Sequence, residues 1–348
     1  MGLFKRSKPR AQSDISRPQR TTPHRSPLDA PLQLITGKGG VGRTTVALNL
    51  GRAYAERGLS TLVLEVRDAE SELGEESSYR ARADSMLGRA AAQELNQTRP
   101  YQLGPDPLEI ASRLWAAQLV APVGHEWFLR TIIPSGRLAR AALESKGLSR
   151  FLRSAPSMHE LGVYYHLARL QSDERFDRII VDLPASGHTL ALTELPERIA
   201  RILRRGALVD ALREGVGRIA DPTYTALWVT TLPEELPVSE ALELAEALES
   251  DGVTPAGVIL NRALARELSD AETMLLKKTL ERADDTRDGV PQSSPSQRAI
   301  ESTICAALLE RDLRARLARF KHQWTLPELA DASARVQHIE RDWFSTST

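Results

Sequence analysis

Residues 32–58 read LQLITGKGGVGRTTVALNLGRAYAERG, and the expected fold is built outward from them. A short apolar run leads into a glycine-rich turn, Gly37-Lys38-Gly39-Gly40-Val41-Gly42, after which Thr44 and Thr45 open a helical pattern that Gly58 can close. Glycines allow the backbone angles and close approach that let successive N–H groups surround phosphate oxygens. The positive end of the following helix points at the same place. The stretch therefore predicts a strand, a phosphate-binding loop and a helix.

One position departs from the usual loop. The GxxxxGK[ST] pattern has a lysine where this chain has Arg43. A planar guanidinium can hold phosphate oxygens through two hydrogen bonds, but it is larger than an ammonium group and not interchangeable with it. We therefore expect nucleotide binding and leave the rate of hydrolysis open. The alternative, a glycine-rich turn without a ligand, is disfavoured by the position of the turn in a strand–helix series.

Composition narrows the class of protein. The chain has 348 residues, of which 41% are hydrophobic and 26% charged, as in a globular protein with one large or two small domains. Lys plus Arg and Asp plus Glu number 46 each, so the whole chain has no bias toward nucleic acid or anionic lipid. The one cysteine, Cys305, excludes an internal disulfide and is expected to be a buried thiol within a helix. No apolar run is long enough to span a bilayer, and a cytoplasmic location is the default.

The two ends and one internal loop are expected to lack stable structure. Residues 1–28 contain seven Lys or Arg against Asp14 alone, which predicts a disordered basic tail able to contact a membrane electrostatically. Residues 284–297 are polar and read as a flexible loop, and 343–348 read as a frayed tail. One domain is expected over 29–342.

Two apolar runs end in aspartate. Thr61–Val66 precedes Asp68, and the run that ends at Val181 precedes Asp182. Such runs are typical of a parallel sheet covered on both faces, and ligands bind at the carboxyl edge of such sheets. An aspartate at a strand end can hold the water ligands of Mg²⁺ in a phosphate-loop protein. Further strands are expected at 226–230 and 257–261, whereas the block at about 84–160 reads as a helical insert. The fold class is therefore α/β: a P-loop NTPase with a mostly parallel sheet, helices on both faces and a helical insert.

Several motifs together resemble one known family. Gly37 to Thr45 is similar to the deviant phosphate loop KGGVGKTT of the signature-lysine ATPases. Within that class, residues 182–190 (DLPASGHTL) resemble the DTAPTGHTL of the ArsA-like ATPases, which drive arsenite pumps or target tail-anchored proteins. Shorter matches follow in the same order, among them Leu260-Asn261-Arg262. The resemblance covers residues 32–262 and weakens after them.

The resemblance implies a role for each matching position. Gly37, Lys38, Gly39, Gly40, Val41, Gly42, Arg43, Thr44, Thr45, Gly187 and Asn261 would bind the nucleotide, with Gly187 as a moving switch glycine and Asn261 at the adenine edge. Lys38 would reach across a homodimer to the partner's nucleotide, and Asp68 would orient the attacking water. Thr44 would bind Mg²⁺ directly, and Asp182 would bind it through water. The cofactors implied are ATP and Mg²⁺.

The resemblance does not identify the client, meaning the molecule that the ATPase would bind or move. Arsenite sites use several thiolates and the targeting factors use a CxxC zinc site, so one cysteine argues against either kind of site. Our leading hypothesis is a homodimeric ATPase whose nucleotide state controls binding of a protein partner. The alternatives are a weakly hydrolysing switch, suggested by Arg43, an arsenite-export subunit, and a partitioning or positioning ATPase.

Overall fold

The computed structural model describes residues 26–66, 85–95, 101–133, 158–184, 221–285, 295–329 and 331–345, together with isolated positions between 134 and 157. Most of the expected basic tail lies outside these ranges. So do two of the expected site residues, Asp68 and Gly187. The structure below concerns the described part of the chain.

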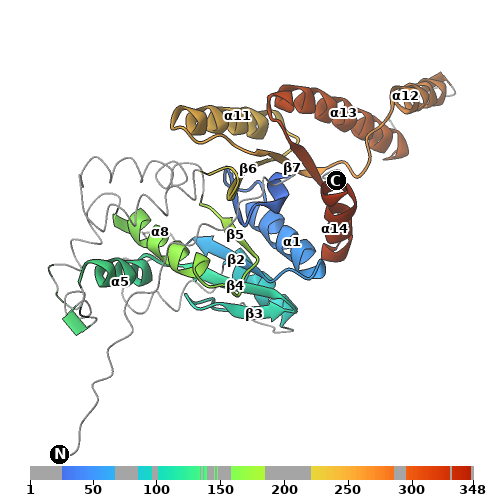
Figure 1. The fold of residues 1–348 in the computed structure, drawn as a ribbon. Coiled ribbons are helices and arrows are strands. Elements are labelled where there is room, and N and C mark those ends of the chain that lie inside the picture. The colour runs from blue at the N-terminus through green and yellow to red at the C-terminus, as the bar shows by residue number, and fades with distance from the viewer. Residues whose placement is uncertain are drawn as a thin grey trace, which may run out of the picture.

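One eight-stranded sheet forms the centre of the molecule (Figure 1). Its order is β3-β4-β2-β5-β1-β6-β7-β8, and only the β3–β4 pair is antiparallel. The mostly parallel sheet predicted from the apolar runs is thus confirmed. The strands are β1 (Leu32–Gly37), β2 (Thr61–Val66), β3 (Leu108–Ala111), β4 (Leu114–Leu119), β5 (Arg178–Asp182), β6 (Thr225–Thr231), β7 (Gly257–Ala263) and β8 (Gln323–Pro327).

Helices cover both faces of the sheet, as predicted (Figure 1). One face packs against η1 (Pro27–Asp29), α1 (Arg43–Glu56), α4 (Met86–Glu94), α14 (Ala332–His338) and η3 (Ile339–Phe344). The other face packs against α8 (Met158–Gln171), α11 (Glu235–Ser250), α13 (Pro295–Arg316) and η2 (Leu317–Arg319). Two more helices, α5 (Ala121–Ile132) and α12 (Asp270–Asp285), complete the described elements.

The central strands are buried on both faces because helices cover both. Every residue of β1 and of β6 is buried, including Gln33. A buried amide needs partners. Gln33 has them: its Oε1 accepts a hydrogen bond from Trp228 Nε1 at 2.7 Å, and its Nε2 donates to the Ala30 carbonyl at 2.8 Å. These bonds fix the entry of the chain into β1.

The expectation of a purely helical insert at 84–160 is wrong at its centre. Residues 108–119 form β3 and β4, and β4 pairs in parallel with β2 along its whole length. A short apolar run such as Leu114–Leu119 fits a buried strand or a helix equally well by periodicity. Pairing with β2 makes this run a strand, and the residues of β2 lie far away from it in the sequence. Helices α4, α5 and the start of α8 do lie within the expected insert.

The expected boundaries also need correction. Ser26 caps η1, and Leu28 is buried against α1, where its carbonyl accepts a hydrogen bond from the Tyr54 hydroxyl. At the other end Trp343 is buried in the same cluster and donates from Nε1 to the Thr325 carbonyl at 2.9 Å. Residues 26–28 and 343–345 therefore belong to the domain. Likewise 284–285 and 295–297, within the expected loop, are helical.

Helices α5 and α8 approach each other at two glycines. A Cβ atom on Gly124 would overlap the Gly162 carbonyl oxygen, and one on Gly162 would lie 2.5 Å from the Ala121 carbonyl oxygen. Beside this crossing His166 is fully buried, and its Nδ1 accepts a hydrogen bond from the Val120 N–H at 3.1 Å. Burial lowers the pKa of His166 to about 4, so the ring is neutral at pH 7.

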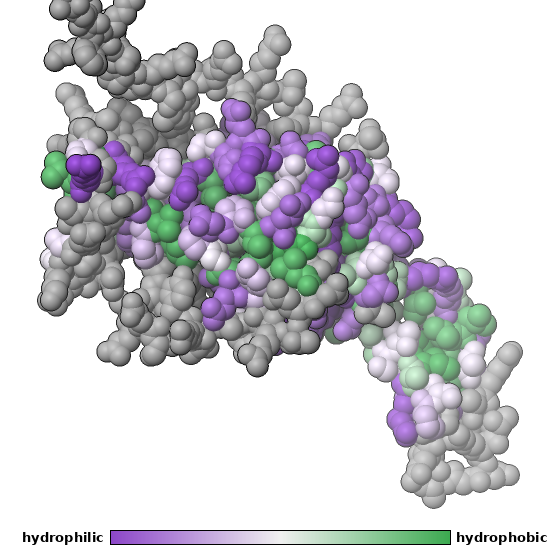
Figure 2. Space-filling view, turned by 90° about the horizontal axis from the view of Figure 1, so that it is seen from below, coloured by the Kyte–Doolittle hydropathy of each residue, from purple (hydrophilic) through white to green (hydrophobic). Residues whose placement is uncertain are grey.

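Helices α12 and α13 form a hairpin that projects from the domain (Figure 1). Figure 2 shows apolar surface on the projecting part of the molecule. Among the large hydrophobic residues, Met274 and Leu275 of α12 and Leu309 of α13 are exposed. Cys305 on α13 is also exposed, so the expectation that it is a buried thiol is wrong. No helix in the described ranges has the length and apolar composition needed to cross a bilayer.

Candidate functional site

The glycine loop joins β1 to α1 at the carboxyl edge of the sheet. Gly37, Gly40 and Gly42 have φ values of +149°, +85° and +85°, which L side chains rarely adopt. Gly37 is also required by space, because a Cβ there would overlap the Thr230 carbonyl oxygen of β6. Around Gly39 and Gly40, by contrast, no atom of the described residues lies within 4 Å of where a Cβ would be. The loop is therefore anchored at its ends and open in its middle.

The first turn of α1 faces this open space. Gly42 precedes the helix in the left-handed conformation, and within the part of the chain that the structure describes no side chain caps the helix. The first N–H groups of a helix lack partners within it and carry its positive dipole end. An open glycine loop followed by such a helix end is suited to hold an anion with several oxygens, as phosphate groups are.

Thr44 and Asp182 meet beside the loop. The Thr44 hydroxyl donates a hydrogen bond to Asp182 Oδ2. Asp182 Oδ1 is buried and has no hydrogen-bond partner among the described residues. Burial raises the pKa of Asp182, while the Thr44 bond and the Arg43 charge lower it. A hydroxyl and a carboxylate with an unsatisfied buried oxygen are ligands that fit Mg²⁺, which prefers oxygen and keeps several waters.

Arg43, the departure from the usual loop, contacts the exit of β5. Its Nη1 donates a hydrogen bond to the Leu183 carbonyl, next to Asp182. The guanidinium therefore connects the start of α1 with the segment that follows β5. A contact of its donors with phosphate oxygens stays a prediction.

Lys38 forms an ion pair within its own chain. Its Nζ lies 3.5 Å from Glu240 Oε1 on α11, and both side chains are partly exposed. Exposed ion pairs contribute on the order of 0–1 kcal/mol, so this contact holds Lys38 only weakly. Nothing in the sequence pattern pointed to Glu240, because it is one of several glutamates on the helix.

Asn261 contacts the loop itself. It is buried at the end of β7, and its Nδ2 donates to the Val41 carbonyl at 2.8 Å. The strand has a bulge between Asn261 and Ala263, and Arg262 takes a left-handed φ of +55°. This bond was not expected from the sequence. The adenine contact expected of Asn261 stays a prediction.

The structure thus brings together the loop residues 37–45, Asp182 and Asn261, while Asp68 and Gly187 fall outside the described residues. It adds two residues that the sequence reasoning missed. Gln118 Nε2 donates to Glu65 Oε2 at 3.3 Å at the carboxyl ends of β4 and β2. A signal existed, because Glu65 is the one charged residue in the run Thr61–Val66.

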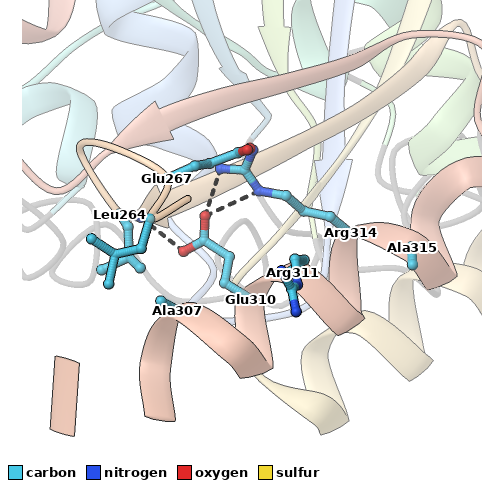
Figure 3. A pocket seen from close by; sticks show the side chains of 8 residues that line it. Leu264, Glu267, Ala307, Glu310, Arg311, Arg314 and Ala315 are labelled. Carbon is cyan, nitrogen blue, oxygen red and sulfur yellow. Dashed lines mark hydrogen bonds and ion pairs between the residues drawn. The ribbon is translucent and has the colours of Figure 1, made fainter. Parts of the chain in front are cut away.

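A separate cavity of about 310 Å³ lies between α13 and the segment that follows β7 (Figure 3). Glu310 is its buried carboxylate. It accepts hydrogen bonds from the Leu264 N–H at 2.8 Å and from the Arg314 guanidinium, which also contacts Glu267. The cavity is lined by Leu264, Glu267, Leu268, Ala307, Glu310, Arg311, Arg314 and Ala315, none of which belongs to the glycine loop. These polar groups bind one another and stabilise the base of the hairpin.

Comparison with known proteins agrees with this geometry. The model of the CobQ/CobB/MinD/ParA nucleotide-binding domain matches residues 32–304. The chain is 26% identical over 268 residues to the ATPase BagA of Mycobacterium tuberculosis, an alignment that covers 74% of this chain and 73% of that protein. It is 27% identical over 252 residues to an arsenical pump-driving ATPase of Escherichia coli, which covers 71% of this chain and 36% of that protein. It is 24% identical over 331 residues to ATPase ARSA1 of Chlamydomonas reinhardtii, which covers 78% of this chain and 40% of that protein.

Proposed function

Because the chain belongs to the CobQ/CobB/MinD/ParA family of nucleotide-binding domains, and within it resembles the ArsA-like ATPases, we propose that it binds Mg²⁺–ATP at the glycine loop and hydrolyses it. The observation that carries the proposal is the junction of loop and helix. There the open backbone at Gly39 and Gly40 adjoins the Thr44 hydroxyl and the unsatisfied Asp182 oxygen.

Each group has a role in this proposal. The backbone N–H groups of residues 39–45 hold the phosphate oxygens. Thr44 and Asp182 hold the metal, Thr44 directly and Asp182 through water, and a bound Mg²⁺ neutralises charge on the phosphates. The Thr44 hydroxyl, which donates to Asp182 Oδ2 in this structure, would be the direct ligand of the metal, and both Asp182 oxygens would then be able to accept hydrogen bonds from water.

The proposal includes a homodimer in the cytoplasm in which Lys38 acts on the partner's nucleotide. A lysine at that position offsets charge that develops on the transferred phosphoryl group. Its ion pair with Glu240 is weak enough to break when the partner approaches. Asp68, two residues after β2 in the sequence, is proposed to orient the attacking water.

The first test is steady-state release of phosphate from ATP with and without Mg²⁺. The Asp68→Asn variant serves as the control, because it is nearly the same size and lacks only the carboxylate charge. The proposal predicts Mg²⁺-dependent turnover in the wild type well above that of the variant. Equal rates in the two proteins would exclude hydrolysis at this site.

A second test separates action on the partner's nucleotide from action on the same chain's nucleotide. Lys38→Ala and Asp68→Asn variants, each inactive alone, are mixed in equal amounts. If Lys38 acts across the dimer, one site of each mixed dimer has both groups, and about a quarter of the wild-type activity returns on random exchange of subunits. No recovery, with exchange verified by mass spectrometry, would place Lys38 at its own chain's nucleotide.

A second function is a nucleotide-dependent switch with little or no hydrolysis. The observation that favours it is the Arg43 bond to the Leu183 carbonyl, which holds the segment after β5 against the start of α1. A lysine cannot form the same planar contact. An Arg43→Lys variant with greatly raised turnover would support the switch, and unchanged turnover would count against it.

The partner is proposed to be a protein whose binding depends on the nucleotide state. The similarity to an arsenical pump-driving ATPase gives arsenite export as an alternative, and partitioning or positioning is another. Co-purification with Asp68→Asn held in ATP, compared with the same variant in ADP, tests for a protein partner. A set of bound proteins that is identical in the two states would count against nucleotide control. Binding of DNA or vesicles that depends on ATP would favour the positioning alternative.

A further inference from the structure

Two carboxylates lie side by side at the carboxyl edge of the sheet. Strand β2 pairs directly with β5, and in that pairing Glu65 is in register with Asp182. On its other side Glu65 is in register with Gln118 of β4. Laterally paired residues in a sheet project from the same face and are near neighbours. The three side chains therefore form one row, Gln118–Glu65–Asp182.

The row faces α1 and the glycine loop. Val63 and Ile180, each two positions before its carboxylate, are buried in the cluster that contains the apolar side chains of α1. Side chains two positions apart in a strand share a face, so Glu65 and Asp182 project toward the same helix. The Thr44 hydroxyl of α1 indeed contacts Asp182. Glu65 is thus a second carboxylate beside Asp182, on the face of the sheet that Thr44 contacts.

Gln118 orients this second carboxylate. Its Nε2 donates to Glu65 Oε2 at 3.3 Å. The earlier residues of β2, Thr61–Leu64, are all buried, and Glu65 is partly exposed at the end of the strand. A carboxylate in an apolar strand is unfavourable unless hydrogen bonds or solvent satisfy it. Gln118 satisfies part of the group and fixes its direction.

We propose that Glu65 is a positioning residue of the metal–nucleotide site. Its carboxylate accepts hydrogen bonds from water bound to the Mg²⁺ that Thr44 and Asp182 hold. Mg²⁺ in nucleotide sites keeps several of its waters, and such waters need acceptors. Outer carboxylates of this kind typically change metal affinity 10–100-fold. This inference rests on the proposed function.

The experiment measures how Mg²⁺ strengthens binding of a fluorescent ATP analogue. Glu65→Gln keeps the size and removes the charge, and Glu109→Gln makes the same change at an exposed residue of β3 as the matched control. We expect Glu65→Gln to raise the Mg²⁺ concentration for half-maximal binding about 10-fold and to leave binding in EDTA unchanged. Glu65→Asp, which retains the charge, should recover part of the effect.

Each result decides between roles. An equal Mg²⁺ dependence in Glu65→Gln and Glu109→Gln would overturn the inference and leave the proposed function standing. A loss of binding in EDTA as well as in Mg²⁺ would show that Glu65 supports the local structure rather than the metal, and would also overturn it. Absence of any Mg²⁺-dependent binding in the wild type would overturn the proposed function, and the inference with it.

Discussion

The side-chain amide of Asn261 donates from Nδ2 to the carbonyl oxygen of Val41 at 2.8 Å and so joins the end of β7 to the glycine loop. The approach is close, because a Cβ on Gly42 would overlap the same amide nitrogen. Asn261 is directed there by the bulge at Arg262. In the strand order of the sheet, β5 lies on one side of β1 and β7 on the other. Asn261 of β7 therefore contacts the loop from one of these directions, and Asp182 of β5 contacts Thr44 from the other.

Replacement of Asn261 by Ala should weaken binding of every nucleotide alike. The substitution leaves the Val41 carbonyl without its donor, which costs about 1–3 kcal/mol for a buried group. The part of this cost that falls on the nucleotide-bound loop weakens affinity, by at most about 5- to 150-fold. Titration calorimetry with ATP, GTP and inorganic triphosphate measures the effect. A loss confined to ATP would instead support the adenine contact that the family resemblance implies.

Replacement of Gly162 by Ala should destabilise the domain by about 2 kcal/mol or more, because the new methyl group would meet the backbone of α5 and neither helix can move freely. Gly104→Ala is the matched control, since the Cβ position of Gly104 has no atom of a described residue within 4 Å. Chemical denaturation measures both variants. Equal midpoints for the two would contradict the close crossing of α5 and α8.

Acid should destabilise the domain through His166. Burial lowers the pKa of His166 from 6.5 to about 4 in the folded chain. Between these values the unfolded histidine binds a proton that the folded one does not, so the free energy of unfolding falls as the pH is lowered from 6.5 toward 4. The full effect is about 3 kcal/mol. Denaturation over this range should give a flatter pH dependence for His166→Gln. Identical slopes would show that other groups dominate.

The thiol of Cys305 should react in the native protein. Cys305 is exposed on α13, and free cysteine elsewhere in the sequence is absent. A maleimide reagent should add one label per chain without denaturant, as measured by mass spectrometry, and Cys305→Ser should take none. If labelling required denaturant, the result would contradict the exposed position of Cys305 and support the buried thiol expected from the sequence.

The sequence was sufficient for the central strands of the sheet and for the loop, because the signals for these elements are local. The apolar runs at β1, β2 and β5 predicted strands, and the glycines of residues 37–42 predicted the turn between β1 and α1; all are confirmed. The family resemblance, drawn from the loop and from residues 182–190, is confirmed by the match to residues 32–304. Roles assigned to Lys38, Asp68 and Gly187 stay predictions.

Elements that depend on contacts between distant parts of the sequence could not be predicted from local patterns. β4 was taken for helix because its partner β2 cannot be identified from periodicity. Leu28 and Trp343 lie in segments expected to be loose tails, because one or two apolar residues beside a polar segment give no periodic pattern. Both are nevertheless buried against elements far away in the sequence. The contacts of Arg43 with Leu183 and of Asn261 with Val41 depend on strand order, which is set only when the whole sheet has formed.

The position of β1 in the sheet has a consequence for synthesis. β1 and its loop leave the ribosome before β5 and β6, which are the two strands that pair with β1. A nascent chain that ends before Thr225 lacks one of the two neighbours of β1, including the Thr230 carbonyl against which Gly37 packs. ATP therefore has no finished loop to bind until β6 has been translated, and products that are truncated before β6 should neither bind ATP nor compete for it.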